Sequence, residues 1–246
     1  MKFNIQKLLV IIFAISIVAC AHHQKVDNMT ISRKMQKADR LYDNHKYNRA
    51  KDIYEIITFE SRGDTLIRKA QFRLANSYFH LKLYEDAIYE YQELLRLYPL
   101  SSYAQNSLFM LGKSYYKISN PPSYDQTETI KAIEYFIQYL SNYPDAENGA
   151  EAENIIYTCR NKLLEKKYDN ADLYFIMGYY NASLMYLKEI LVLNRTSDID
   201  EKSSILAAKI YIDQKDWDSL AILLERFRKN YPNHPYIKVI EQFIVE

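Results

Sequence analysis

Glycine and proline are scarce in this sequence, with four glycines and six prolines among 246 residues. Both residues mark turns and are far more frequent in average proteins, so their scarcity predicts few turns and long helices. The formal net charge is only +1. A charge balance of this kind argues against a nucleic-acid-binding surface and against a polybasic arm that would bind a membrane.

Motifs that carry enzymatic chemistry are missing as well. The sequence has no glycine-rich phosphate loop and no cluster of histidine, cysteine and glutamate at metal-ligand spacing. Its five histidines are scattered, apart from His22 and His23, which lie in a polar segment and are expected to be solvated. We therefore predict that the protein is not an enzyme and that it holds neither a metal ion nor a non-covalent cofactor.

The first residues have the composition of a secretory signal. Lys2 and Lys7 precede the apolar run Leu8–Val18, which is shorter than the roughly 20 residues that a membrane-spanning helix needs. The run ends in the sequence IVAC. This ending resembles the bacterial lipobox, in which the chain is cut before the cysteine and the thiol receives diacylglycerol. We predict a lipoprotein signal peptide at 1–19 and a covalent N-acyl diacylglycerol anchor on Cys20, with an ordinary signal peptide as the alternative.

Lipidation of Cys20 would leave Cys159 as the only other cysteine, so a disulfide framework is excluded. Cys159 lies in a helical pattern and is predicted to be a small core residue. Residues 20–32 are predicted to form the lipidated cysteine and a flexible polar tether. Several acyl chains on one cysteine hold a protein stably at a membrane, so the anchor implies a location in a bacterial envelope.

Residues 69–99 contain a regular spacing of small and aromatic side chains. Its positions are Leu74, Ala75, Tyr78, Tyr84, Ala87, Tyr91, Leu94 and Pro99. This is the pattern of the tetratricopeptide repeat (TPR), a 34-residue unit of two antiparallel helices. Alanines let the helix backbones approach, and tyrosines fill the gaps between successive helices, with hydroxyls expected to reach water at the edge of a thin layer. The aromatic spacing is therefore predicted to be mainly structural.

The same register recurs in four further segments. The matching positions are Ala38, Leu41, Tyr47, Ala50 and Tyr54 in the first unit; Leu111, Gly112, Tyr115, Ala132, Phe136, Tyr139 and Pro144 in the third; Ala171, Tyr174, Tyr180, Ser183, Leu187 and Ile190 in the fourth; and Ala207, Ala208, Tyr211, Trp217, Leu220, Leu224, Phe227 and Pro232 in the fifth. The predicted fold is an all-α, TPR-like α-solenoid of about five helix-turn-helix repeats.

The repeats fall into two groups along the chain. Units 1–3 are predicted at 33–146, with an insertion, SNPPSYDQTE, in the third unit. A linking helix is predicted at 147–170 and is expected to continue into the fourth unit. Units 4 and 5 are predicted at 171–246, where a final apolar segment reads as a capping helix.

The first helices of such repeats line a concave surface whose outward residues select a ligand. In the second and third units these outward positions are Phe72, Asn76, Phe79, Phe109, Lys113 and Tyr116. Phenylalanine is not needed there to hold the repeat together. We therefore predict an aromatic groove for an extended segment, with Asn76 and Lys113 receiving a terminal carboxylate. The alternative is that the capping segment or the tether fills this groove.

The order of parts resembles the BamD family, lipoproteins of the outer-membrane β-barrel assembly (BAM) machine. The likeness covers essentially the whole mature chain: a lipobox, three units with an insertion in the third, a linking helix and two further units. Its most specific stretch is Leu163–Leu191, where Ala171, Tyr174, Gly178 and Tyr179 occupy matching places. Met177 and Tyr186 stand where that family usually has arginines facing the barrel-bearing partner. The resemblance therefore implies a partner-binding surface at Met177, Gly178 and Tyr186 that is less ionic here.

The resemblance further implies a non-enzymatic scaffold, lipid-anchored at the periplasmic face of the outer membrane. Its implied partners are the barrel-bearing component, unfolded outer-membrane proteins and other accessory lipoproteins. The groove would receive the last strand of an unfolded barrel. Ala21, in place of aspartate after the lipidated cysteine, implies the outer rather than the inner membrane.

Other envelope TPR lipoproteins remain as alternatives. A pilus-secretin pilot and a cell-division coordinator would use the same repeat and the same lipobox. A subunit of a nutrient-uptake complex would need larger insertions than the short one here. The insertion and the linking helix favour the assembly factor.

Overall fold

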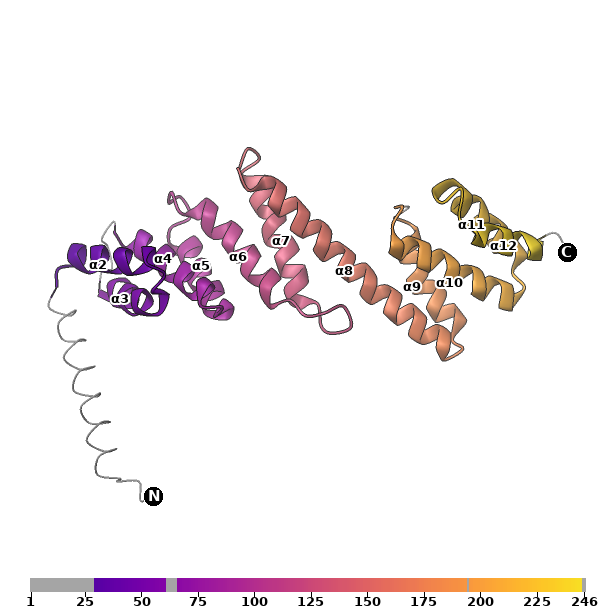
Figure 1. Ribbon diagram of the computed structural model, residues 1–246, viewed down its shortest axis with the longest axis horizontal. Coiled ribbons are helices and arrows are strands. Elements are labelled where there is room, and N and C mark those ends of the chain that lie inside the picture. The colour runs from indigo at the N-terminus through magenta and orange to yellow at the C-terminus, as the bar shows by residue number, and fades with distance from the viewer. Residues whose placement is uncertain (1–28, 61–65, 194, 245–246) are drawn as a thin grey trace, which may run out of the picture. The chain divides into compact units, whose positions relative to one another are not determined.

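The computed structural model describes residues 29–60, 66–193 and 195–244, and Figure 1 shows the regular structure of these residues as helices. The helices are α2 (Ile31–Asp43), α3 (Tyr47–Glu60), α4 (Leu66–His80), α5 (Tyr84–Leu97), α6 (Ala104–Ile118), α7 (Thr127–Asn142), α8 (Gly149–Ile176), α9 (Tyr180–Leu191), α10 (Asp198–Gln214), α11 (Trp217–Asn230) and α12 (Tyr236–Ile244). The predicted fold class, an all-α TPR-like solenoid, is confirmed. Among the described helices, none has the length and apolarity to cross a membrane. Cys20, the signal peptide and most of the predicted tether lie outside the described residues.

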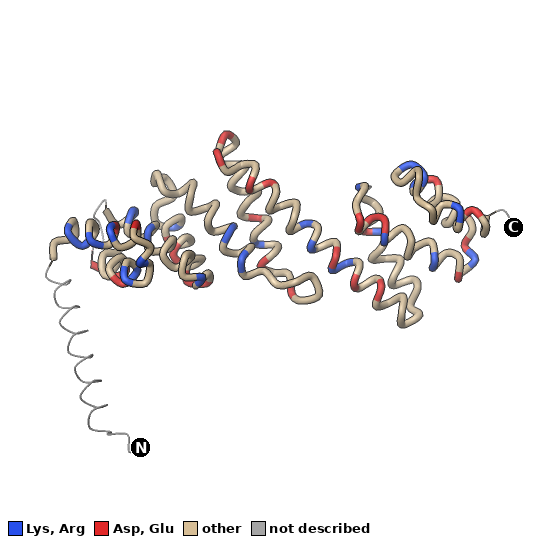
Figure 2. The backbone as a smooth tube through the Cα atoms, viewed as in Figure 1, with Lys and Arg blue, Asp and Glu red and all other residues tan. Residues whose placement is uncertain are grey.

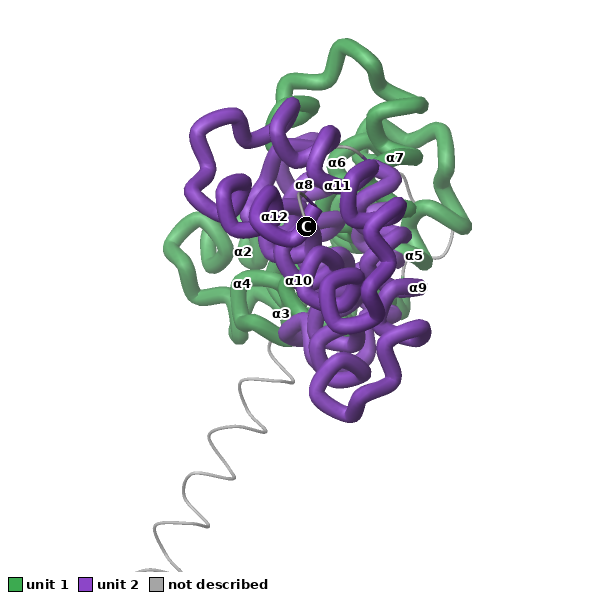
Figure 3. Tube along the Cα trace, turned by 90° about the vertical axis from the view of Figure 1, so that its right-hand side faces the viewer, with its two compact units in different colours: residues 1–118, 134–152 green, residues 119–133, 153–246 purple. Residues whose placement is uncertain are grey.

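The chain divides into two compact units, drawn in separate colours in Figure 3. Unit 1 comprises residues 1–118 and 134–152, and unit 2 comprises residues 119–133 and 153–246. The boundaries between the units therefore pass through α7 and α8. Helix α8 runs without a break through residue 170, where the sequence placed the end of the linking helix. Helix α2 begins at Ile31, inside the segment predicted as tether.

Small side chains lie at the helix crossings of unit 1. Ala38, Ala50, Ala75 and Ala87 are fully buried, as are the large side chains Tyr54 and Tyr91 that fill the neighbouring space. Close approach at the alanines creates the gaps, and the rings restore interior packing density there. Helix α5 ends at Leu97, two residues before Pro99, because proline cannot continue the hydrogen-bond pattern.

Four helix turns share one backbone geometry. His45, Lys82, Gly178 and Lys215 each have φ between 56° and 76°, in the left-handed region. At Lys82 the amide donates to the carbonyl oxygen of Phe79 at 3.0 Å, and the next amide donates back to that of Tyr78 at 3.0 Å. This pair of bonds satisfies the last carbonyls of a helix and is usually built on glycine. Scarcity of glycine therefore did not prevent tight turns, because lysine and histidine occupy three of these positions.

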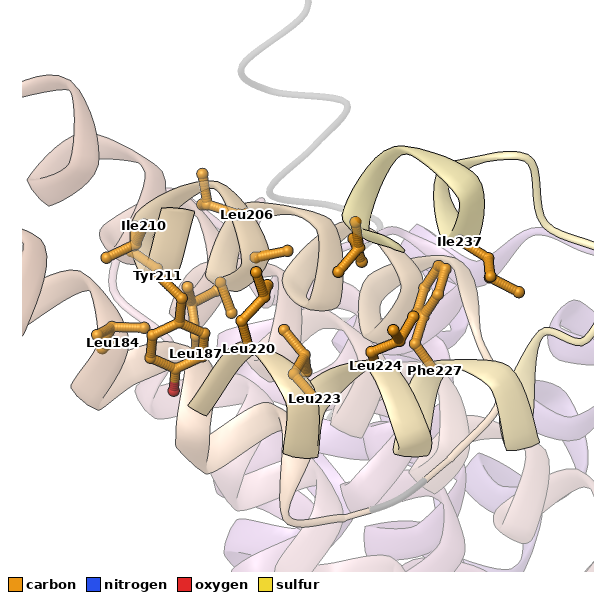
Figure 4. Close-up of a cluster of buried hydrophobic side chains, with 14 residues drawn as sticks. Leu184, Leu187, Leu206, Ile210, Tyr211, Leu220, Leu223, Leu224, Phe227 and Ile237 are labelled. Atoms are coloured by element: carbon orange, nitrogen blue, oxygen red, sulfur yellow. The ribbon is translucent and has the colours of Figure 1, made fainter. Parts of the chain in front are cut away.

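The core of unit 2 joins α9 to α12 (Figure 4). Leu187 of α9, Leu220 and Phe227 of α11 and Ile240 of α12 are almost fully buried in it. Helix α12 has its apolar stripe against this core, as a capping helix does. The groove residues predicted from the sequence belong to unit 1, so the capping segment contributes its apolar residues to a different core.

Candidate functional site

The residues predicted to line the groove divide into half-buried and fully packed side chains. Phe72 on α4 is half-buried and stacks on Tyr103, with ring centroids 5.2 Å apart. Phe79, about two turns further along the same helix face, is also half-buried and meets the ring of Tyr84 edge-on at 5.2 Å. Both rings therefore present part of their surface to solvent while resting on a neighbouring tyrosine.

Phe109 is a core residue, and its assignment to an open groove is wrong. Its side chain is only 4% exposed. The ring lies 5.6 Å from that of Phe136 and 5.3 Å from that of Tyr139, both on α7. Register places Phe109 at an outward position of its repeat, but α7 covers that position with two large rings. Sequence spacing alone did not show this, because it does not reveal how closely the paired helix approaches.

The two residues predicted to receive a carboxylate have partners inside the protein. The Asn76 side-chain oxygen accepts a hydrogen bond of 2.5 Å from the Tyr91 hydroxyl. The Lys113 ammonium lies 2.8 Å from a Glu151 oxygen and 5.6 Å from the ring centroid of Phe109. A carboxylate ligand would thus compete with Glu151 for Lys113. Tyr116, in the next turn of α6, is half-buried.

The second candidate surface lies at the turn between α8 and α9, in unit 2. Gly178 has φ of +76°, and a side chain added there would meet open space. Its amide donates to the carbonyl oxygen of Phe175 at 2.9 Å, and the Tyr179 amide donates to that of Tyr174 at 2.9 Å. Glycine is therefore present at this position for its backbone conformation, and the turn projects Met177 into solvent.

The residues around this turn form an exposed apolar surface, which we call the turn surface. Its members are Leu173, Ile176, Met177, Tyr179 and Met185, each between 55% and 73% exposed. The sequence contains no charged residue between Asp172 and Lys188, and Figure 2 shows the α8–α9 turn free of both charge colours. Of these five residues, the sequence analysis assigned only Met177 to a partner-binding surface; it named Tyr179 as a family match without that role. The absence of charge over this stretch was the signal that would have found them.

The side chain of Tyr186 is partly buried and packs against other residues of unit 2. Its ring stacks on that of Tyr174, with centroids 5.7 Å apart and planes 14° from parallel, and it rests against the core of unit 2. Tyr174 and Gly178 in turn line a cavity of about 610 Å³ beside the turn surface. Tyr186 therefore supports the wall of this region, and Met177 is the member of the predicted pair that faces solvent.

The described residues contain no recognisable metal centre. Within them, no group of three or more histidine, cysteine, aspartate or glutamate side chains is placed to hold a metal ion. Cys159 is buried in α8, and burial raises the pKa of its thiol, which disfavours the reactive thiolate.

Paired helices joined by matching turns define a TPR-like protein, and residues 205–234 match the tetratricopeptide repeat model. Residues 27–194 match the model of the YfiO family, described as an outer membrane lipoprotein. The chain belongs to this family, and the resemblance to BamD proteins inferred from the sequence is confirmed.

Two curated relatives carry the BamD name. The chain is 28% identical over 178 residues to the "Putative outer membrane protein assembly factor BamD" of Aquifex aeolicus, covering 71% of this chain and 58% of that protein. It is 22% identical over 112 residues to the "Outer membrane protein assembly factor BamD" of Rickettsia prowazekii, covering 46% of this chain and 45% of that protein. The match thus spans about half the length of these relatives. Among solved structures, the "TPR2AB-domain:pHSP90-complex of yeast Sti1" aligns with a TM-score of 0.45 and 15% identity over 87% of this chain and 97% of that chain.

Proposed function

We propose that this protein is a non-catalytic scaffold for the assembly of outer-membrane β-barrel proteins. Membership of an outer membrane lipoprotein family supports this role, as do the names of the two curated relatives. A lipid on Cys20 would hold the protein at the periplasmic face of the outer membrane. Accessory lipoproteins would attach to the same scaffold.

The turn surface is the observation that carries the proposal. Five apolar side chains exposed in the uncharged stretch between Asp172 and Lys188 mark a site for protein contact. The resemblance to the BamD family implies that this region faces the barrel-bearing component, where the family usually has arginines. Here the contact would bury methionine and tyrosine, which are favoured at the centres of protein interfaces. The affinity would then depend little on salt, because few ion pairs contribute to it.

Isolation of the protein from its membranes tests the role. The full chain would carry a carboxyl-terminal tag and be captured in mild detergent, and the captured proteins would be identified. We expect a barrel-bearing assembly component among them. Recovery of pilus-secretin or cell-division proteins without that component would favour the alternative adaptor roles and refute this proposal.

A pair of variants tests the turn surface itself. Met177→Glu places a charge in the proposed interface, whereas Ile222→Glu places one at another exposed apolar position, on α11. We expect the first change to weaken capture of the barrel-bearing component by more than about tenfold, equivalent to 1.4 kcal/mol, and the second to leave it unchanged. Equal effects of both variants would show that the turn surface is not the contact.

The outer faces of Phe72 and Phe79 are proposed to receive the last strand of an unfolded barrel protein. Phe109 takes no part, since it is packed in the core. Phe79→Ala is expected to weaken binding of a barrel-derived terminal peptide severalfold in fluorescence anisotropy, because it removes one of the two half-buried phenylalanine rings that would contact the peptide. Unchanged affinity, with an unchanged melting temperature, would rule out this groove.

A further inference from the structure

A second cavity lies in unit 1, between α3 and α5, with its floor on α4. Its volume is about 660 Å³, within the range of ligand-binding sites in proteins. Most of its lining comes from the second helices of the repeats, whereas the predicted groove is built on the first helices. It therefore forms a separate candidate site.

The rim of this cavity is apolar and exposed. Phe59 on α3 is 80% exposed, and Tyr89 and Leu97 on α5 are about half exposed. Three large apolar side chains gathered at the mouth of one cavity would gain from being covered, at roughly 25 cal/mol for each Å² removed from water. A bound segment must therefore supply an apolar group for this rim.

The interior is acidic. Glu55, Glu90 and Glu93 all line the cavity, with Arg96 as its one cation. Glu93 is paired with Arg96 at 2.6 Å, and Glu55 lies 3.7 Å from the Lys51 ammonium. Glu90 differs from both, because the neutral side-chain amide of Gln71 donates a hydrogen bond to it at 2.5 Å. Among the described residues, no lysine or arginine forms an ion pair with Glu90.

The pKa of Glu90 is raised to about 7, chiefly by burial, with smaller contributions from the nearby carboxylates of Glu55, Glu93 and Asp86. A half-buried carboxylate without a cation is costly, and a cation brought by a ligand would relieve that cost. The cavity holds one acid without a cationic partner beneath an apolar rim. A complementary ligand would therefore carry a cation for the acid and apolar groups for the rim.

We propose that this cavity binds a partner protein segment in which a lysine or arginine is adjacent to bulky apolar residues. The cationic side chain would enter the cavity and donate hydrogen bonds to Glu90, while its apolar neighbours cover Phe59, Tyr89 and Leu97. The site does not rest on the proposed function, since neither the turn surface nor the predicted groove contributes to it.

A pair of short peptides tests the site on the full chain in detergent. The probe is an amino-terminally labelled, carboxyl-amidated peptide of sequence GLKFLG, and its partner carries norleucine in place of lysine, which keeps the stem and removes the charge. At pH 8 we expect the lysine peptide to bind at least about tenfold more tightly in fluorescence anisotropy, as one charge-assisted hydrogen bond provides. Equal affinities, or binding by neither peptide at millimolar concentration, would overturn the proposal.

Two glutamine variants on α5 locate the preference. Glu90→Gln should abolish the difference between the peptides, because the amide keeps the shape and loses the charge. Glu85→Gln makes the same change of net charge at an exposed position outside the cavity and should preserve the difference. Loss of the preference in both variants would indicate general attraction to an acidic surface and refute a specific site. Phe59→Ala should weaken the binding of both peptides by the same factor. Unchanged affinities would refute the role of the rim.

Discussion

Tyrosine explains much of unit 1 at the scale of single residues. Tyr54 and Tyr91 are fully buried, and their hydroxyls donate to Asp39 at 2.7 Å and to Asn76 at 2.5 Å. The sequence led us to expect hydroxyls reaching water, but these two are satisfied by side chains of the facing helix. Burial raises the pKa of both phenols. A tyrosine here combines the volume of a core residue with a bond that fixes helix pairing.

Removal of the Tyr91 hydroxyl should therefore cost stability. Tyr91→Phe is expected to lower the free energy of unfolding by about 1–2 kcal/mol, because the Asn76 carbonyl group loses its partner in a buried place. Tyr89→Phe, at an exposed position of the same helix, is the control and should change it by less than about 0.5 kcal/mol. Urea denaturation measures both, and equal values would contradict a buried hydrogen bond.

Glu90 should make stability depend on pH. Its pKa is about 7 in the folded protein and about 4.3 in an unfolded chain. Between these values the folded state holds a proton that the unfolded chain has lost, so stability falls as pH rises through this window. Glu90→Gln removes the cost of burying the charged carboxylate. We expect the free energy of unfolding to rise by about 2 kcal/mol at pH 8 and hardly at all at pH 4.

Urea denaturation at the two pH values checks this expectation. Glu85→Gln serves as the control. Its free energy of unfolding should fall by at most about 0.5 kcal/mol at either pH, since an exposed acid near a helix start contributes little to stability. A destabilised Glu90→Gln at pH 8 would contradict an uncompensated buried charge. If Glu90→Gln is more stable and yet no longer prefers the lysine peptide, its loss of preference cannot be caused by unfolding.

At the scale of helices, close approach is controlled by single small residues. A β-carbon built on Gly112 of α6 would lie 3.2 Å from two ring carbons of Phe136 on α7, and that ring is fully buried. At Gly149, the first residue of α8, the nearest atom would be 3.8 Å away. Gly112 therefore permits the close approach of α6 and α7, whereas Gly149 has enough space around it for a β-carbon.

Substitution should reveal this difference. Gly112→Leu is expected to destabilise the protein by about 3 kcal/mol, because the fixed Phe136 ring leaves no room for a side chain. Gly149→Ala should be neutral or slightly stabilising, since alanine favours the helical conformation. Thermal unfolding followed by circular dichroism compares them. A stable Gly112→Leu protein would show that α6 and α7 do not pack as described.

At the scale of the whole molecule, the proposed lipid anchor would decide where the proposed scaffold acts. Cys20 lies outside the described residues, and its lipidation rests on the lipobox resemblance and on membership of a lipoprotein family. Cys20→Ser removes the thiol that would receive the lipid. We expect this variant to leave the membrane fraction, because the polar segment that follows cannot hold the chain at a bilayer. Fractionation followed by immunoblotting measures this, and continued membrane association after a high-salt wash would contradict a lipid anchor.

The sequence by itself determined the fold class and the repeat register, because small residues, aromatics and prolines at fixed spacing report local geometry directly. It also pointed to Met177, because this residue stands where the resembled family usually has an arginine. It did not determine that Phe109 is packed in the core, that Lys113 pairs with Glu151, or that Glu90 lines a cavity.

Only the tertiary structure decided these three points. Each depends on a side chain from another helix: the Phe136 and Tyr139 rings cover Phe109, and an α8 carboxylate reaches Lys113. Glu90 is half-buried in a cavity lined by residues of α3, α4 and α5. Register along one helix fixes the direction of a side chain, but the distance to the next helix fixes whether that side chain is available to a partner.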